Sequence, residues 1–236
     1  MTLLRIVIPS KNEEHYLPSL LDSIRNQSLK DLEIVIADAK SEDNTRFIAK
    51  HYSCKVVKGG YADIGRNNGV DGCECPLICF IDADVIIPHS NFLDTSIKEF
   101  QKRKLDVAGT LQKPIPTGKK IKDLAYTIIY AISNSGILLS ENTKKPLMQN
   151  LMIIKTKVHQ DIGGFLPYEF AEDSIFAKMA VAKGYKFGIL RDPGREWISA
   201  RRFEKNGFWK MSSDILCRLK PTASLGSVVQ LLILDV

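Results

Sequence analysis

The chain has no long hydrophobic run, only four histidines and only five cysteines. No apolar stretch reaches the roughly 20 residues that a membrane-spanning helix needs, so a spanning helix is not expected. The N-terminus enters an apolar segment, residues 3–8, that Arg5 interrupts and Pro9 ends, which is unlike a secretion signal. An odd number of cysteines without such a signal predicts reduced thiols and a cytoplasmic location.

A structural zinc site is also not expected. Cys73, Cys75 and Cys79 are close in sequence, but Cys79 falls inside an apolar, strand-like run. Neither a histidine nor a fourth cysteine is near enough in sequence to complete four ligands.

The formal charge of +6 gathers in residues 98–122 and 191–220. No helix-turn-helix, zinc-finger or aromatic RNA-binding signature accompanies it, so nucleic acid is not the expected partner. A nucleoside diphosphate, a phosphorylated acceptor or an anionic lipid surface would use the same charge. The alternative is an ordinary solvated face.

The most informative segment is residues 77–88, where an apolar run leads directly into Asp82 and Asp84. Five consecutive apolar residues, 77–81, predict a strand that is buried on both faces. Two carboxylates at its end cost solvation energy unless a positive group compensates them. A divalent cation carried by a diphosphate would do so, because hard cations take carboxylate and phosphate oxygens together. The alternative is a strand-end turn whose aspartates cap the next helix.

Strand-like and helix-like segments alternate along the first half of the chain, which predicts an α/β fold with a Rossmann-like, mostly parallel sheet and helices on both faces. The expected strands cover residues 3–8, 33–37, 55–57, 77–81, 107–111, 150–154 and 185–190. The expected helices cover residues 15–27, 45–52, 64–72, 90–102 (with Ser90 as N-cap), 124–139, 174–183 and 208–219, and residues 113–120 form a loop. We expect one domain, residues 1–220, with a nucleotide-binding half (1–110), an acceptor half (111–220) and an apolar tail (221–236).

Polar residues also follow the first two expected strands, in residues 9–14 and 38–45. In a parallel sheet these strand ends meet the same edge as Asp82 and Asp84, where ligands bind. Asp38 and Glu13 would then accept hydrogen bonds from a base or a ribose. Turn and helix-capping chemistry is the alternative reading of residues 38–45.

Seven short motifs in order resemble those of family 2 glycosyltransferases with the GT-A fold. They are residues 9–14 (PSKNEE), 38–45 (DAKSEDNT), 65–69 (GRNNG), 82–84 (DAD), 163–165 (GGF), 172–176 (EDSIF) and 199–203 (SARRF). The resemblance implies a metal-dependent, inverting enzyme that moves one sugar from a UDP- or GDP-linked donor to a carbohydrate or polyprenyl-phosphate-type acceptor. The Gln-x-x-Arg-Trp signature of processive synthases is absent, which favours single-sugar transfer.

The same resemblance implies roles for individual residues. Asp84 would bind Mn²⁺ or Mg²⁺ on the donor's diphosphate, and Asp82 would contact the ribose or the metal shell. Asp173 would be the general base, with Glu172 as the competing candidate. The residues expected to bind the nucleotide sugar are Pro9, Lys11, Glu13, Asp38, Arg66, Asp82, Ala83, Gly164, Glu172, Arg201 and Arg202.

Each of these roles has a structural alternative. Glu172 and Asp173 would cap a helix, the arginines would form surface ion pairs, and the glycines at 163 and 164 would end a helix. Lys11 stands where many family members have tyrosine, and Ala39-Lys40 replaces a more usual acidic pair, which leaves the donor base open.

Two other functions are compatible with such a sheet. A sugar nucleotidylyltransferase should carry a glycine-rich loop near the N-terminus, which residues 9–14 lack. A non-catalytic binding module is favoured if Asp82, Asp84 or Asp173 is lost, and all three are present.

Two apolar segments, residues 124–139 and 228–234, raise the question of membrane contact. They would lie in a membrane interface beside the lysines at 119, 120 and 122, at the inner face of the cell membrane, or be buried in the core or a homodimer contact.

Overall fold

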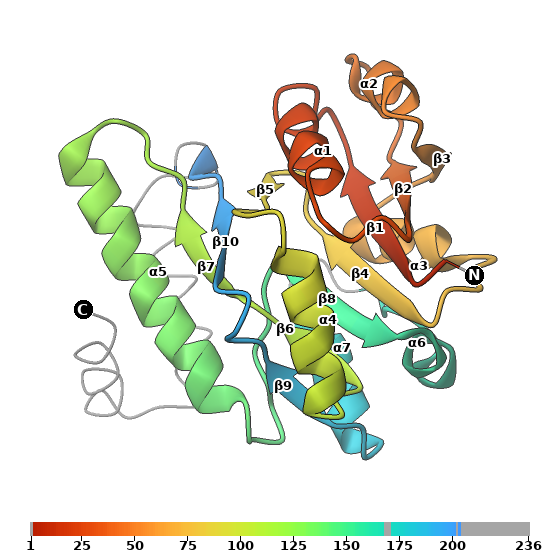
Figure 1. Ribbon diagram of the computed structural model, residues 1–236, viewed down its shortest axis with the longest axis vertical. Coiled ribbons are helices and arrows are strands. Elements are labelled where there is room, and N and C mark those ends of the chain that lie inside the picture. The colour runs from red at the N-terminus through yellow and green to blue at the C-terminus, as the bar shows by residue number, and fades with distance from the viewer. Residues whose placement is uncertain (1, 168–170, 202, 204–236) are drawn as a thin grey trace.

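The computed structural model describes residues 2–167, 171–201 and 203, and a seven-stranded sheet forms its centre (Figure 1). In spatial order the strands are β3 (Lys55–Lys58), β2 (Leu32–Asp38), β1 (Leu4–Ser10), β4 (Leu77–Ile81), β8 (Leu151–Lys155), β6 (Val107–Gly109) and β9 (Phe187–Ile189). Only β8 runs against its neighbours, β4 and β6, and the other pairs are parallel. The predicted mostly parallel α/β sheet is therefore confirmed.

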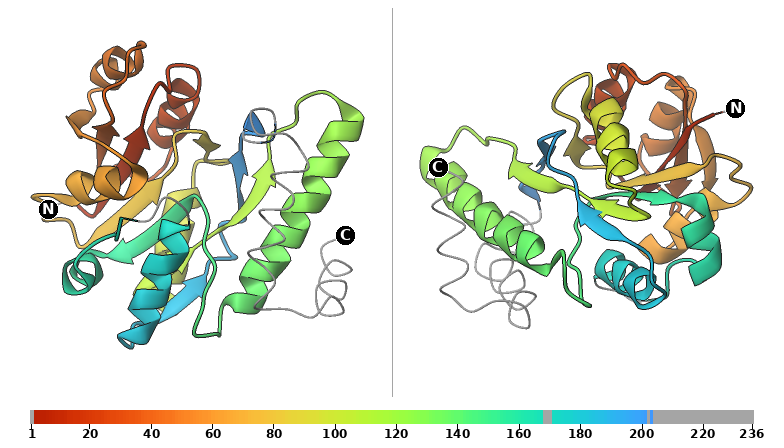
Figure 2. Two further views of the ribbon diagram at one scale, coloured as in Figure 1. Left: turned by 180° about the vertical axis from the view of Figure 1, so that it is seen from behind. Right: turned by 60° about the horizontal axis from the view of Figure 1, so that its bottom comes forward.

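Helices cover both faces of this sheet because its central strands are apolar on both faces. Within β4, Leu77, Cys79 and Ile81 join one core cluster, whereas Ile78 and Phe80 join the other. The first cluster packs under α1 (Leu17–Arg25), α2 (Thr45–His51) and α4 (Phe92–Lys102). The second packs under α3 (Ala62–Val70), α6 (Thr156–Ile162) and α7 (Glu172–Ala182), seen from behind in Figure 2.

A second, three-stranded sheet continues the first one beyond its carboxyl edge. It contains β5 (Val85–Ile86), β10 (Arg195–Ile198) and β7 (Leu111–Pro114), in that order. Each of its strands follows a strand of the main sheet along the chain: β5 follows β4, β7 follows β6 and β10 follows β9. The second sheet therefore lies directly beyond the point where β4 ends in Asp82 and Asp84.

Helix α5 (Lys120–Ser140) packs against β7 and forms hydrogen bonds with backbone groups of this strand (Figure 1). The Asn134 side chain donates to the Gln112 carbonyl (2.8 Å) and accepts from the Gln112 N–H (3.1 Å). Asn134, a polar residue in the middle of this helix, is thus buried and hydrogen-bonded to the edge of strand β7. Among the described residues, no helix is both long enough and apolar enough to cross a membrane.

Three details of the predicted elements are wrong. The strand expected over residues 107–111 breaks at Thr110, because its two halves belong to different sheets, and the loop expected over 113–120 begins as strand β7. Ser90 does not cap α4, which begins at Phe92 after Asn91. The short helix α6, the strands β5 and β10, and the first turn of α5 were not predicted. The helix expected over 208–219 and the tail 221–236 lie outside the described residues.

The loop after α6 is held by Asn67 of α3. The Asn67 Nδ2 donates to the Phe165 carbonyl (2.9 Å), and its Oδ1 accepts from the Phe165 N–H (2.8 Å). Gly163 ends α6 in the left-handed conformation, as the helix-end alternative predicted, and Gly164 has a φ of 82°. A Cβ on Gly164 would stand 2.5 Å from Asn67 Oδ1, so this approach requires glycine.

The same Asn67 oxygen lies 3.0 Å from Nε2 of His159, which is buried and stacks on Phe176. Since Oδ1 can only accept, Nε2 of His159 carries a proton and donates it to Asn67. Burial lowers the pKa of His159 from its ordinary value of 6.5 to about 4.

We therefore expect stability to fall in mildly acidic solution. Between pH 6.5 and about 4 the unfolded chain takes up a proton at His159 that the folded chain does not, so the free energy of unfolding decreases as pH falls. Urea unfolding of the wild type and of His159→Gln, which keeps a donor for Asn67, measures this effect. The wild type should lose up to about 3 kcal/mol more than the variant across this window. Equal pH dependence of the two proteins would contradict the assignment.

Candidate functional site

The candidate site lies where β4 leaves the main sheet. A tight turn follows the strand, in which the Val85 N–H donates to the Asp82 carbonyl (3.2 Å) and Ala83 is buried. The Ser199 N–H donates to the Asp84 carbonyl (3.1 Å), which attaches the turn to the end of β10. The structure thus places both predicted metal-binding carboxylates at the carboxyl end of the central strand, with Asp84 buried and Asp82 partly exposed.

Arg66 of α3 connects this turn to the start of α7. Its guanidinium pairs with Glu172 (2.8 Å), Asp82 (3.1 Å) and Asp173 (3.3 Å), and the residue is only 2% exposed. Burial lowers the pKa of Arg66, but the three carboxylates outweigh that effect and raise it above its ordinary value. The surface ion pair considered as an alternative for Arg66 is therefore wrong, and its charge is committed to three acids of the site.

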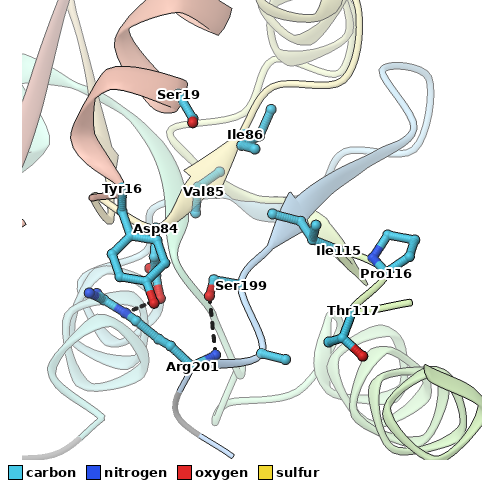
Figure 3. A pocket seen from close by; sticks show the side chains of 11 residues that line it. Tyr16, Ser19, Asp84, Val85, Ile86, Ile115, Pro116, Thr117, Ser199 and Arg201 are labelled. Atoms are coloured by element: carbon cyan, nitrogen blue, oxygen red, sulfur yellow. Dashed lines mark hydrogen bonds and ion pairs between the residues drawn. The ribbon is translucent and has the colours of Figure 1, made fainter. Parts of the chain in front are cut away.

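Arg201 pairs with two other carboxylates of the site, those of Asp84 and Glu13. Its Nε donates to Asp84 Oδ2 (2.7 Å), Nη1 donates to Glu13 Oε2 (2.5 Å), and the guanidinium lies over the Tyr16 ring, 4.6 Å from its centre (Figure 3). Burial lowers the pKa of Arg201, and its pairing with Glu13 and Asp84 more than reverses this. Burial raises the pKa of Glu13, although Arg201 offsets part of the effect.

Five carboxylates therefore surround two guanidinium groups at the end of β4 and the start of α7. The carboxylates are those of Glu13, Asp82, Asp84, Glu172 and Asp173. Hard divalent cations take such oxygen donors, so the donor set of Asp82 and Asp84 fits Mn²⁺ or Mg²⁺. A cation on Asp84 would compete with Arg201 for the same carboxylate.

The expected nucleoside-binding residues lie at the ends of β1 and β2. Pro9 pairs with Ala37 in the sheet, and Lys11 is exposed just beyond it. Asp38 is buried and accepts from the Ser41 N–H (3.2 Å) and from Arg46 Nε (2.5 Å). The Asp38 carboxylate is thus already hydrogen-bonded within its own turn.

Reciprocal hydrogen bonds join the two loops that follow β1 and β2. The Glu13 N–H donates to Thr45 Oγ1 (2.8 Å), and the Glu14 N–H donates to Asp43 Oδ2 (3.0 Å). Asp43 Oδ1 also accepts from the Thr45 N–H (2.9 Å) at the start of α2. Turn and capping chemistry, the alternative for this segment, therefore describes Asp43, and it holds Glu13 where Arg201 meets it.

A cavity of about 240 Å³ opens beside Arg201 (Figure 3). It lies between the start of α1, the strand β5 and the loop that follows β7, and its lining includes Tyr16, Ser19, Asp84, Ile115, Thr117 and Arg201. The cavity joins a carboxylate and a guanidinium of the site to an apolar wall, which suits a sugar or an acceptor chain.

The sequence analysis missed Glu196, a fully buried carboxyl group on β10. It accepts hydrogen bonds from Thr110 and from Gln112 Nε2 (3.3 Å), and burial raises its pKa to about 8. Asp82 adds to this shift, so Glu196 lies within electrostatic range of the site. Nothing in the sequence around Glu196 distinguishes it from a surface glutamate, because only the second sheet buries it.

The structure also places the remaining expected residues. Gly164 lies against Asn67, one position along α3 from Arg66. Arg202 lies outside the described residues.

The sequence matches the family described as Glycosyl transferase family 2 over residues 5–171. It is 29% identical over 218 residues to the 4,4'-diaponeurosporenoate glycosyltransferase of Staphylococcus haemolyticus, which covers 84% of this chain and 56% of that protein. The chain therefore spans little more than half of that relative's length.

Two solved structures have the same fold. The crystal structure of S. aureus TarS 1-349 in complex with UDP-GlcNAc has a TM-score of 0.64 at 21% identity, covering 84% of this chain and 58% of that one. The mannosyltransferase PcManGT from Pyrobaculum calidifontis, in complex with GDP-Man and Mn²⁺, has a TM-score of 0.63 at 16% identity, covering 97% of this chain and 78% of that one. The family match over most of the chain and the shared architecture show that this chain belongs to glycosyl transferase family 2 and has the GT-A fold.

Proposed function

We propose that the chain is a metal-dependent, inverting glycosyltransferase that moves one sugar from a UDP- or GDP-linked donor to an acceptor hydroxyl or a lipid phosphate. The observation that carries the proposal is the pair of carboxylates, Asp82 and Asp84, at the carboxyl end of β4, where Arg66 and Arg201 also meet them. A divalent cation bound by these carboxylates would let an anionic diphosphate approach them, because hard cations take carboxylate and phosphate oxygens together. PcManGT was crystallised with GDP-Man and Mn²⁺, which agrees with this reasoning.

Asp84, with Asp82, would hold the Mn²⁺ or Mg²⁺. When bound, the cation supplies Lewis-acid stabilisation of the charge that develops on the departing nucleoside diphosphate. Arg201 would give up Asp84 to the cation, and its planar guanidinium is suited to donate to diphosphate oxygens instead.

Asp173 would act as the general base. In the transfer, the acceptor oxygen bonds to the anomeric carbon while the bond to the diphosphate breaks, and the acceptor proton passes to Asp173. A phosphate acceptor would need no such transfer. Arg66 pairs with both Glu172 (2.8 Å) and Asp173 (3.3 Å), and the family motif that residues 172–176 resemble favours the aspartate as the base.

The two other functions are less well supported. Residues 9–14 form a hydrogen-bonded loop without glycine, unlike the phosphate loop of a nucleotidylyltransferase. A binding module would not need the acids at 82, 172 and 173 to converge on one arginine. The donor base stays open between UDP and GDP, because Lys11 is exposed and Asp38 is engaged within its own turn.

Calorimetric titration with UDP, GDP and their sugar conjugates, with Mn²⁺ or with a chelator, tests the donor site. We expect one base to bind at least about tenfold more tightly with Mn²⁺, and Asp84→Asn to abolish this gain because it removes a charged ligand. Asp94→Asn, which breaks an exposed ion pair with Lys98 on α4, is the matched control and should behave as the wild type. Binding that ignores the metal, or a gain that survives in Asp84→Asn, would overturn the proposed metal dependence.

Single-turnover kinetics with the donor identified in this way test the base. Asp173→Asn should lower the rate of sugar transfer by about 10²–10⁴-fold and leave Mn²⁺-dependent donor binding unchanged, because only proton transfer is lost. Glu172→Gln, which also removes a negative charge beside Arg66, should lower the rate of sugar transfer less than Asp173→Asn does. Comparing the two variants separates loss of the base from disturbance of the ion pairs around Arg66. An unimpaired Asp173→Asn enzyme would exclude this role.

We extend the proposal to membrane contact, because the first half of α5 carries an exposed apolar face. Ile121 is 87% exposed, Leu124 and Ile128 are also exposed, and three lysines stand at the start of the helix. The second half of α5 is buried in the core, as the structural alternative predicted, and residues 228–234 lie outside the described residues. An amphipathic segment of this kind suits an anionic interface on the cytoplasmic side, where a polyprenyl-phosphate acceptor would be presented.

Flotation with vesicles that contain anionic lipid tests this contact. The wild type should float at low salt and Leu124→Asp should not, because the substitution places a charge on the inserted face. Phe47→Asp, at a 72% exposed apolar residue of α2, is the control and should float as the wild type does. A wild-type protein that stays unbound contradicts membrane contact. In that case, sedimentation of the wild type tests the alternative, a homodimer in which the second copy of the chain covers the same apolar face of α5.

A further inference from the structure

Three potential metal ligands meet at the opposite end of the sheet from the candidate site. The side chains of Glu33, Cys73 and Cys75 place one ligand atom each within 4.8 Å of one another. Glu33 lies near the start of β2, and the two cysteines lie in the segment between α3 and β4. A zinc site was not expected from the sequence, because no further ligand lies near the cysteines in sequence. The sheet brings Glu33 to them from 42 residues before Cys75.

Arg5 holds the segment that carries the cysteines. This buried guanidinium donates to the carbonyls of Val70 (3.2 Å), Asp71 (3.0 Å) and Gly72 (3.2 Å) at the end of α3. The Cys73 N–H then donates to the Val70 carbonyl (2.9 Å). Both cysteines therefore follow a turn fixed by several hydrogen bonds, and pre-positioned ligands are what a metal site requires.

Thr156 fixes the other side of the segment. Its Oγ1 donates to the Cys75 carbonyl, and its N–H donates to the Pro76 carbonyl (3.0 Å). Cys75 is consequently only 4% exposed, whereas Cys73 and Glu33 are partly exposed. The cluster is therefore buried on the Cys75 side and reaches the protein surface at Cys73 and Glu33.

The hydrogen bonds within the cluster point to a single ion position. Glu33 Oε1 accepts from Arg5 Nε (2.7 Å) and from Cys75 Sγ (3.0 Å), so the thiol and the carboxylate already face each other. Arg5 would remain as the outer partner that orients the ligating carboxylate. Two thiolates and one carboxylate carry three negative charges, Arg5 supplies one positive charge, and a divalent cation would supply the other two. Lys55, on the adjacent strand β3, is a further cation near Glu33.

We propose that Cys73, Cys75 and Glu33 form a binding site for a thiophilic divalent cation such as Zn²⁺, with water as the fourth ligand. Thiolates select Zn²⁺ over Mn²⁺ and Mg²⁺, which prefer the oxygen ligands at Asp82 and Asp84. Zinc–sulfur bonds of about 2.3 Å place two sulfur ligands about 3.8 Å apart. The ligand atoms lie within 4.8 Å of one another, so the widest separation would close by up to about 1 Å, whereas Cys75 Sγ and Glu33 Oε1, 3.0 Å apart, would move slightly apart. The ion would join the end of α3 to β2, behind the helix that carries Arg66 and Asn67.

Titration of the full chain, prepared metal-free in the presence of a reductant, with Co²⁺ and then Zn²⁺ tests the site. We expect a thiolate-to-cobalt absorption band that saturates near one equivalent and disappears when Zn²⁺ is added. Zinc at about 100 times its dissociation constant should raise the unfolding midpoint by about 5–10 °C. A wild-type protein without the band excludes the site.

Variants locate the ion. Cys73→Ser and Cys75→Ser should each abolish the band, whereas Cys54→Ser, at a partly buried thiol elsewhere, should keep it. Asp84→Asn should also keep it, which separates this site from the nucleotide-sugar site and makes its outcome independent of the proposed transferase function. A band of full intensity in both Cys73→Ser and Cys75→Ser would overturn the proposal.

Alkylation of the wild type covers the case in which these variants do not fold. Zinc should slow modification of Cys73 and leave that of Cys54 unchanged, as followed by mass spectrometry. Equal alkylation of Cys73 with and without zinc, or a Cys73–Cys75 disulfide that forms equally in its presence, counts against the site.

Discussion

The arrangement of the site depends on one buried cation, the guanidinium of Arg66. Burying a guanidinium costs several kcal/mol of solvation, and that cost is offset only when carboxylates and hydrogen bonds surround the group. Here Asp82 comes from the end of β4, and Glu172 and Asp173 come from the start of α7. Arg66 therefore joins the half of the domain expected to bind the nucleotide to the half expected to bind the acceptor. It sets the separation between the carboxylates expected to meet metal and acceptor.

Arg66 also works together with its neighbour along α3. Asn67 fastens the loop at Gly164 and Phe165, so two successive side chains of one helix position both the acids of α7 and the loop that precedes them. The packing of α3 against β1 thus affects acceptor-side geometry although α3 belongs to the first half of the chain. Arg5 also fixes α3, because its guanidinium donates to carbonyl groups at the end of this helix.

The two ends of the sheet differ in the chemistry that they favour. At the carboxyl ends, hard oxygen ligands collect and Arg201 occupies Asp84 and Glu13. At the amino ends, two thiols and one carboxylate collect around Arg5. In each place an arginine lies among the acids. The ligand chemistry favours Mn²⁺ or Mg²⁺ at the first end and, in the site that we propose, a thiophilic cation at the second.

Much of this protein could be predicted from local sequence. Runs such as residues 77–81 must be buried strands because they are apolar on both faces, and the acids that follow them must lie at a sheet edge. Local pattern does not reveal partners across the fold. The break at Thr110, the burial of Glu196, the sharing of Arg66 among three acids and the meeting of Glu33 with Cys73 and Cys75 all depend on strands that pair far apart in sequence. By itself, the sequence determined the strands of the main sheet, most of the helices and which polar residues follow the strands. Only the tertiary structure decided which charges meet, because a buried charge is stable only next to partners that chain folding brings to it.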